Sequence, residues 1–147
     1  MVWGAITSDG KSRLVFEKIY MEEILKKELI PWTRRHFGNR PFRFQQDGAP
    51  SHTAKDVQQL LQQEMSDFIK SDEWPPSSPD LNPLDYAVWG FLEAMACSTP
   101  HKSLTSLRKA LQKAWEEIDD NYLRAVVDAF RHRLRACVAA KGGIFEI

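Results

Sequence analysis

The sequence has few cysteines, no long apolar run and no excess of charge of either sign. Its two cysteines, Cys97 and Cys137, form neither a Cys-x-x-Cys pair nor a disulfide framework, so we expect two reduced, mostly buried thiols and no zinc site. The lack of a long apolar run and of a signal-like N-terminus predicts a soluble intracellular domain that spans no membrane. The formal net charge of zero argues against a strongly basic nucleic-acid module.

The charged residues are nevertheless unevenly placed along the chain. A basic cluster and a later acidic cluster stand out, the first made of Arg34, Arg35, His36, Arg40 and Arg43 and the second of Glu64, Asp67, Asp72 and Glu73. The basic cluster could contact phosphates. A solvated helix end followed by a loop explains it at least as well, because Lys and Arg also favour helix C-termini.

Periodicity predicts one domain over residues 1–147 with a core built from the 43% of residues that are hydrophobic. The expected elements are a hairpin of residues 2–6 and 13–16, strands at 42–46 and 67–69, and helices at 20–33, 53–63, from 84, at 104–119 and at 122–139. Helical spacing assigns to the core Ile24, Leu25, Leu29, Trp32, Val57, Leu60, Leu61, Val88, Phe91, Leu92, Met95, Leu104, Leu107, Leu111, Trp115, Ile118, Leu123, Val127, Phe130 and Leu134.

Two carboxylates follow points where the chain changes direction. Asp47 comes directly after the alternating strand pattern of residues 41–46, at the edge of a sheet where ligands usually bind. Asp85 comes three residues after Asn82, and Asn82-Pro83 is typical of an N-cap followed by proline at the first helical position. Asp85 therefore belongs to the first turn of a helix, away from its apolar stripe. Alone, Asp47 is equally typical of a turn residue beside Gly48, and Asp85 of a capping acid.

Two strings around these acids carry a family resemblance. QQDGAPSHTA at residues 45–54 and WPPSSPDLNPLDY at residues 74–86 resemble the second and third acidic motifs of the Tc1/mariner transposases. Residues 1–12 resemble the hairpin that follows the first motif, and residues 135–143 resemble the C-terminal end of that catalytic domain. The resemblance covers nearly the whole chain.

The resemblance implies an α/β fold of the RNase H-like class, with a mixed sheet flanked by helices. It also implies DNA transposition and integration, with DNA as partner, two divalent ions, Mg²⁺ or Mn²⁺, as cofactors, and the nucleus as location. Asp47 matches the second catalytic acid and Asp85 the third, which makes both the implied catalytic and metal-binding residues. Weaker DNA-binding candidates are Arg34, Arg35, Arg40, Arg43 and His52, although a hydrogen-bonded loop histidine is the simpler interpretation of His52.

The sequence departs from the family pattern at its start. The first of the three family acids lies on a strand upstream of the Val2 hairpin, and Asp9 cannot replace it because Ser8-Asp9-Gly10-Lys11 is typical of a solvent-facing hairpin turn. We therefore expect an N-terminally truncated domain that lacks its first central strand and does not cut DNA by itself. Without that strand the sheet either re-pairs or leaves a marginally stable domain, and a homodimer through the exposed strand edge is a third option.

Three functional hypotheses follow. The first, which we favour, is a transposase-derived catalytic fragment that binds DNA or metal weakly. The second is a domesticated DNA- or protein-binding module that has kept the scaffold without catalysis. The third is a nuclease that takes its missing acid from another polypeptide.

Overall fold

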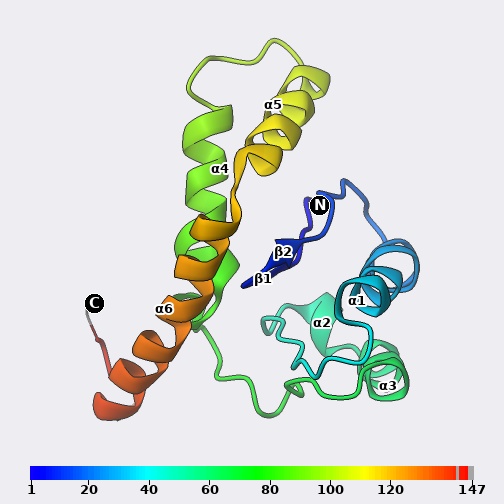
Figure 1. The fold of residues 1–147 in the computed structure, drawn as a ribbon, viewed down its shortest axis with the longest axis vertical. Coiled ribbons are helices and arrows are strands. Elements are labelled where there is room, and N and C mark those ends of the chain that lie inside the picture. The colour runs from blue at the N-terminus through cyan, green and yellow to red at the C-terminus, as the bar shows by residue number, and fades with distance from the viewer. Residues whose placement is uncertain (142, 146–147) are drawn as a thin grey trace. The chain divides into compact units, whose positions relative to one another are not determined.

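The computed structural model describes residues 1–141 and 143–145, so Gly142, which we expected just after the last helix, lies outside the described residues. Two compact units are present, one formed by Met1–Ala5 and Ser12–Ser78, the other by Ile6–Lys11 and the chain from Pro79 onward. The elements, shown in Figure 1, are β1 (Ile6–Thr7), β2 (Gly10–Lys11), η1 (Tyr20–Leu29), α1 (Ile30–Phe37), α2 (Pro50–Thr53), α3 (Lys55–Glu64), η2 (Pro79–Leu81), η3 (Leu84–Val88), α4 (Trp89–Ala96), α5 (Leu104–Glu117) and α6 (Asp120–Ala139).

The predicted hairpin is present. Trp3 pairs with Val15 in the first unit through backbone hydrogen bonds of 2.8 and 2.9 Å. In the second unit β1 and β2 are antiparallel, with Ile6 opposite Lys11. Asp9 is exposed in the turn and accepts a hydrogen bond from the Thr7 hydroxyl at 3.0 Å, as the turn signature predicted.

The first unit is built around one long helix, which η1 and α1 form without interruption. Pairs of oppositely charged residues one turn apart, such as Glu22 with Lys26, support its exposed face. The helix runs to Phe37, beyond the predicted end at residue 33, and stops at Gly38, whose φ of 55° lies in the region that favours glycine. Its buried face packs with α3 into a core that includes Trp3, Val15, Tyr20, Ile24, Leu25, Leu29, Ile30, Val57, Leu61 and Met65.

The sheet is smaller than the sequence predicted. The expected strands at 42–46 and 67–69 meet at a single parallel bridge between Phe44 and Phe68. The Phe44 N–H donates to the Asp67 carbonyl at 3.0 Å, and the Ile69 N–H donates to the Phe44 carbonyl at 2.9 Å. Within the described residues no β-bridge joins 13–16 to 42–46. A strand paired on one side only, between Pro41 and a turn at Asp47, is too short for a regular ladder.

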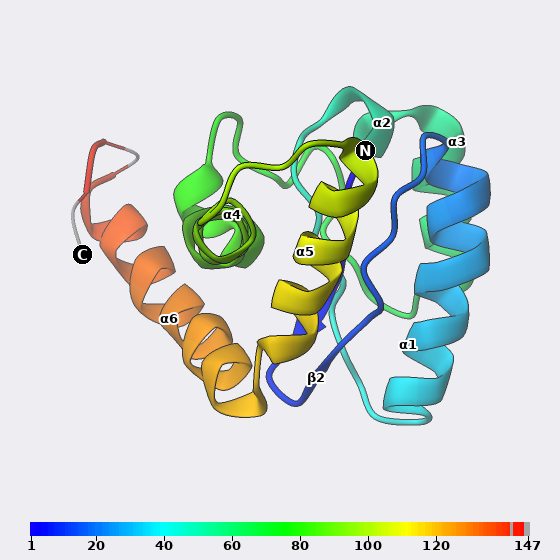
Figure 2. The same cartoon turned by 90° about the horizontal axis from the view of Figure 1, so that it is seen from above.

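The second unit is helical apart from β1 and β2. Figure 2 looks along α4 and shows α5 beside it, and the two helices pack together. Side-chain caps begin the next two helices: Ser103 and Ser106 form a capping box on α5, and Asp119 accepts from the Tyr122 N–H at 2.8 Å on α6. The buried side chains in these helices and η3 are Val88, Leu92, Ala96, Ala114, Trp115, Leu123 and Val126.

Several core predictions were wrong in detail. Met95, Leu104 and Leu134 are exposed, and Trp32 and Leu60 are only partly buried. Next to Met95, the small residue Ala96 is buried instead. Cys97 is also exposed, contrary to expectation, although both cysteines are free thiols. In the described part of the chain, no helix has both the length and the apolar character that a membrane crossing needs.

Candidate functional site

Asp47 lies in a turn that its own side chain closes. The bridge at Phe44 fixes the strand-like segment before Asp47. Asp47 Oδ1 accepts a hydrogen bond from the Ala49 N–H at 2.9 Å. Such a bond from an aspartate to the backbone two residues on is typical of an Asx turn. The carboxylate is 39% exposed, so it is held by the fold and still reaches solvent. Gly48 follows, and the Trp74 ring is 3.5 Å from the place a side chain on that glycine would occupy.

His52 is the second partner of the Asp47 carboxylate. Its Nδ1 is 2.5 Å from Asp47 Oδ1 and 3.3 Å from the Asp47 carbonyl oxygen, and its side chain is 17% exposed. Both oxygens that face Nδ1 are acceptors, so we assign the imidazole form that has a proton on Nδ1. The sequence left His52 open as a DNA-binding candidate or a hydrogen-bonded loop histidine. The structure shows a hydrogen-bonded histidine that contacts the candidate acid Asp47.

Tyr20 and Gln46 support this histidine from behind. The Tyr20 and His52 ring centroids are 4.5 Å apart, and the Tyr20 hydroxyl donates to Gln46 Oε1 at 2.6 Å. Gln46 Nε2 in turn donates to the His52 carbonyl at 3.1 Å. Burial and the nearby Asp47 charge raise the pKa of Tyr20 well above its usual value, so its hydroxyl stays a donor. Sequence reasoning did not identify Tyr20, because nothing in the spacing of distant residues indicates this contact.

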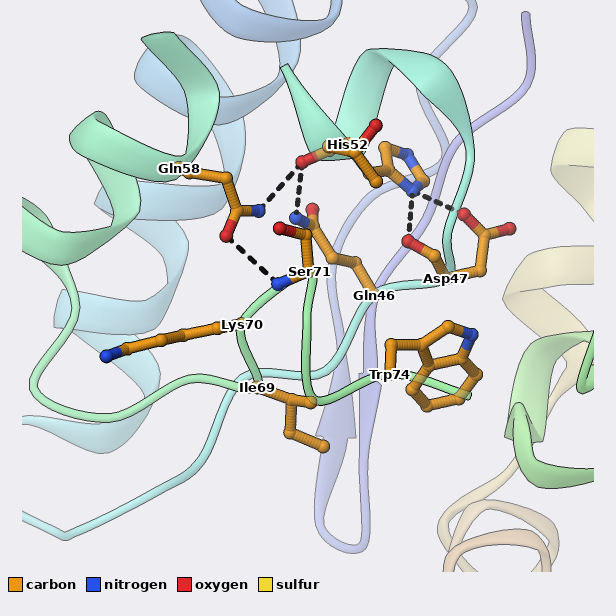
Figure 3. A pocket seen from close by; sticks show the side chains of 9 residues that line it. Gln46, Asp47, His52, Gln58, Ile69, Lys70, Ser71 and Trp74 are labelled. Atoms are coloured by element: carbon orange, nitrogen blue, oxygen red, sulfur yellow. Dashed lines mark hydrogen bonds and ion pairs between the residues drawn. The ribbon is translucent and has the colours of Figure 1, made fainter. Parts of the chain in front are cut away.

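These residues border a shallow surface hollow, which Figure 3 shows from close by. Gln58 closes its far side: its Nε2 donates to the His52 carbonyl at 2.8 Å, and its Oε1 accepts from the Ser71 N–H at 3.1 Å. The hollow belongs entirely to the first unit. Its polar wall on the Asp47 side is thus a connected set of hydrogen bonds, and its opposite wall includes Ile69 and Trp74.

Asp85 is held by its own turn in the second unit. Residue 83 is already helical, and Asn82 caps the helix, with its Oδ1 accepting from the Leu84 N–H at 3.3 Å. Asn82 Nδ2 donates to Asp85 Oδ2 at 2.8 Å, and the Asp85 carboxylate is exposed. The predicted cap and the first-turn position of Asp85 are both confirmed.

Tyr86 anchors the same turn to α6. Its hydroxyl donates to the Val126 carbonyl at 2.6 Å, and the Arg133 guanidinium lies over its ring at 4.1 Å. Burial raises the pKa of Tyr86 to about 12, an effect that the Arg133 charge opposes. The backbone that carries Asp85 is therefore fixed by the residue immediately after it.

The donor chemistry of both acids fits a hard divalent cation, because carboxylate oxygens are the ligands that Mg²⁺ and Mn²⁺ prefer. Each acid belongs to a different unit. Over residues 1–141 and 143–145, no group of three or more His, Cys, Asp or Glu side chains is placed to hold an ion. The described residues thus supply carboxylate ligands but no complete three-ligand cage.

The basic cluster is partly neutralised by the acidic one. Arg34 pairs with Glu64 at 2.5 Å, and Arg43 pairs with Asp67 at 2.8 Å. Arg40 donates to the His36 carbonyl at 2.7 Å. The sequence placed these two clusters apart, and the first unit brings them together because the end of α1 and the end of α3 lie on the same side of it. Arg35 is exposed at the end of α1.

Comparison with known proteins finds one family over most of this chain. A family model described as "DDE superfamily endonuclease" matches residues 1–108. The Tc3 transposase of a transposable element from Caenorhabditis elegans is 31% identical over 149 residues, covering 97% of this chain and 44% of that protein. The chain spans about half the length of the curated relatives it matches.

Solved structures give the fold class. The catalytic domain of Mos1 mariner transposase matches with a TM-score of 0.82 at 22% identity, over 99% of this chain and 76% of that one. The Mos1 paired-end complexes with Mn and with the left transposon end match with TM-scores of 0.77 and 0.76, at 24% and 25% identity, each over 99% of this chain and 44% of theirs. The predicted RNase H-like α/β class is confirmed, with the regular sheet reduced as described above.

Proposed function

Because this chain belongs to the DDE superfamily of endonucleases, as a Tc1/mariner-type transposase catalytic domain, we propose that it acts in DNA transposition, with Asp47 and Asp85 as metal-binding catalytic carboxylates. The observation that carries this proposal is the state of Asp47. Its Oδ1 is committed to His52 and the Ala49 N–H, whereas no hydrogen bond from the described residues to Oδ2 is found. A carboxylate held on one oxygen and open on the other is suited to bind a cation.

The proposed ligands of Mg²⁺ or Mn²⁺ are Asp47 in the first unit and Asp85 in the second. Bound ions in such sites activate the attacking oxygen and stabilise the leaving oxygen of a phosphoryl transfer. The chain's own part is to present the two carboxylates: Asp47 through its Asx turn and Asp85 through the Asn82 cap. Support for a metal comes from a structural neighbour, since the Mos1 paired-end complex was crystallised with Mn.

We further propose that full DNA cutting needs a third carboxylate in addition to these two. Support comes from the described residues, which contain no group of three His, Cys, Asp or Glu able to hold an ion. A nuclease that recruits this acid from another polypeptide fits the same observation. A fragment without the third acid would bind a single ion weakly and would not cut.

DNA is the proposed partner and the nucleus the proposed location. Support for DNA comes from the Mos1 paired-end complex with the left transposon end. On this chain the proposed phosphate contacts are Arg34, Arg35, Arg40 and Arg43, of which Arg34 and Arg43 would have to exchange the carboxylates of Glu64 and Asp67 for phosphates. We also propose a homodimer through the edge of the short strand pairing at Phe44, which sedimentation of a well-folded monomer would rule out.

The test is calorimetric titration of the chain with MnCl₂ and MgCl₂, compared with an Asp47→Ala/Asp85→Ala double variant. Matched controls are Asp9→Ala and Asp128→Ala, which remove exposed acids elsewhere. Binding that disappears in the double variant and persists in both controls supports the proposal. Equal binding in all four proteins contradicts it.

DNA association distinguishes the binding-module alternative. A metal-dependent catalytic domain predicts binding or cleavage that the Asp47→Ala/Asp85→Ala variant changes in the presence of Mn²⁺. A module without catalysis predicts salt-sensitive DNA binding that is the same in wild type and in the Asp47→Ala/Asp85→Ala variant. Fluorescence anisotropy with a labelled duplex at two salt concentrations separates the two outcomes.

A further inference from the structure

Behind Asp47 lies a set of side chains that the proposed metal chemistry does not use. They are Tyr20 at the start of η1, Gln46 beside Asp47, His52 in α2 and Gln58 in α3. Together they join three helices to one carboxylate. All belong to the first unit, and all their contacts are described within it.

The segment that carries His52 cannot hold its position alone. The helix α2 has only four residues, Pro50–Thr53, and so short a helix has little intrinsic stability. None of its residues is buried. The position of His52, and with it the 2.5 Å contact between its Nδ1 and Asp47 Oδ1, must therefore come from contacts outside α2.

Two amides fix the backbone of His52. Gln46 Nε2 and Gln58 Nε2 donate to its carbonyl oxygen at 3.1 and 2.8 Å. Either glutamine could turn its amide over and present oxygen instead, which would repel that carbonyl. At Gln46 the Tyr20 hydroxyl completes the favourable orientation, because it donates to Oε1 at 2.6 Å while Nε2 faces the His52 carbonyl.

Tyr20 also sets the plane of the imidazole. The two rings lie 4.5 Å apart at 43°, and Tyr20 is only 5% exposed, fixed by the core of η1. The phenol therefore acts on His52 twice, through the ring face and through the Gln46 amide.

We propose that Tyr20 and His52 are positioning residues for Asp47: they turn its carboxylate so that Oδ1 is bound inward and Oδ2 is directed outward to a divalent cation. The inference rests on the proposed function in taking Asp47 as a metal ligand. Removing a residue that orients a metal ligand lowers metal affinity about 10–100-fold.

Four variants test the proposal. His52→Ala removes the donor to Oδ1, and His52→Asn restores one, because the Asn Nδ2 is as many bonds from the backbone as the His Nδ1. Tyr20→Phe keeps the ring over His52 and loses only the hydroxyl. Tyr122→Phe is the matched control, since its hydroxyl donates to the Ala87 carbonyl at 3.2 Å in the second unit.

Two readouts on the ¹⁵N-labelled chain are used. The first, without metal, is the chemical shift and exchange rate of the Ala49 amide, whose hydrogen bond to Asp47 Oδ1 reports the carboxylate orientation. The second is the Mn²⁺ concentration that broadens the Gly48 and Ala49 signals, with Asp47→Asn as the blank. Thermal unfolding of each variant shows that it remains folded.

We expect His52→Ala to shift the Ala49 amide and to weaken Mn²⁺ binding about 10-fold or more, and His52→Asn to recover most of both. In both the Ala49 amide signal and the Mn²⁺ affinity, Tyr20→Phe should lie between wild type and His52→Ala, and Tyr122→Phe should match wild type. An unchanged Ala49 amide and affinity in His52→Ala, or no recovery in His52→Asn, overturns the proposal. If even wild type shows no Asp47-dependent broadening, the metal function fails, and the metal-free amide readout alone decides the positioning role.

Discussion

The two candidate acids are held in different ways. Asp47 depends on side chains from η1, α2 and α3, and the residues that support it are distant in the sequence. Asp85 depends on Asn82, one turn earlier, and on the backbone of the same helix. The described side-chain partner of the Asp85 carboxylate is therefore local in sequence, with Tyr86 tying the same turn to α6, whereas the side chains around Asp47 come from three helices. Perturbations of the core should disturb Asp47 first, whereas changes to one capping residue should disturb only Asp85.

The largest expected effect is a loss of stability when the core of the first unit, which contains Asp47, is changed. Leu61 in α3 is fully buried, and Leu61→Ala should lower the free energy of unfolding by about 2–5 kcal/mol, because a cavity adds to the lost burial. Urea unfolding followed by tryptophan fluorescence measures it. Leu134→Ala, at an exposed position of α6, is the control and should change stability by no more than about 0.5 kcal/mol. Equal losses in the two variants would contradict the assignment of the core.

Alkaline titration compares the tyrosines beside the two acids. Tyr86, next to Asp85, should ionise near pH 12, and Tyr20 after it, because Tyr20 is more deeply buried and faces the Asp47 charge. A pKa raised in the folded state means that the stabilisation is complete below about pH 10, the usual tyrosine value, and is lost as pH rises through about 12. Absorbance of the phenolate measures this, with Tyr86→Phe identifying its step. A step near pH 10 that Tyr86→Phe removes would show that Tyr86 is not protected.

The cap of the Asp85 helix should give a smaller, local effect. Asn82→Ala removes both the cap and the donor to Asp85 Oδ2, at a cost of about 1 kcal/mol. Asn82→Asp is the informative partner variant: it keeps an oxygen for the cap but places a second negative charge beside Asp85. Denaturation curves of both variants, with the Ala49 amide as a monitor, should show lost stability with an unchanged Asp47 turn. A shifted Ala49 amide signal would contradict the expectation that a change in the Asn82 cap disturbs only Asp85.

The smallest effect is expected at the exposed ion pair between Arg34 and Glu64. Arg34→Gln should change stability by no more than about 1 kcal/mol, since exposed pairs contribute little. It should weaken DNA binding in proportion to the lost phosphate contact and lower its salt dependence. Glu64→Gln frees the same arginine and should have the opposite effect on binding. If both variants bind DNA like wild type, Arg34 is not part of the interface.

Much of the site could be predicted from local patterns. The hairpin turn at Asp9, the Asn82 cap and the position of Asp85 all follow from residues within a few positions of one another, and all are confirmed. Core positions were less well predicted. Met95 and Leu134 fit the helical stripe and yet are exposed, because periodicity gives the face of a helix but not how far its neighbours cover it.

The sequence by itself determined the family, through the strings around Asp47 and Asp85, and the elements whose signals are local, through caps, turns and helical spacing. Only the tertiary structure decided that Tyr20 supports His52, that Arg34 and Arg43 face Glu64 and Asp67, and that residues 42–46 pair on one side alone. The physical reason is the distance along the sequence between the residues in contact. A cap or turn is fixed by hydrogen bonds between near neighbours, whereas these contacts join residues that only chain folding brings within bonding distance.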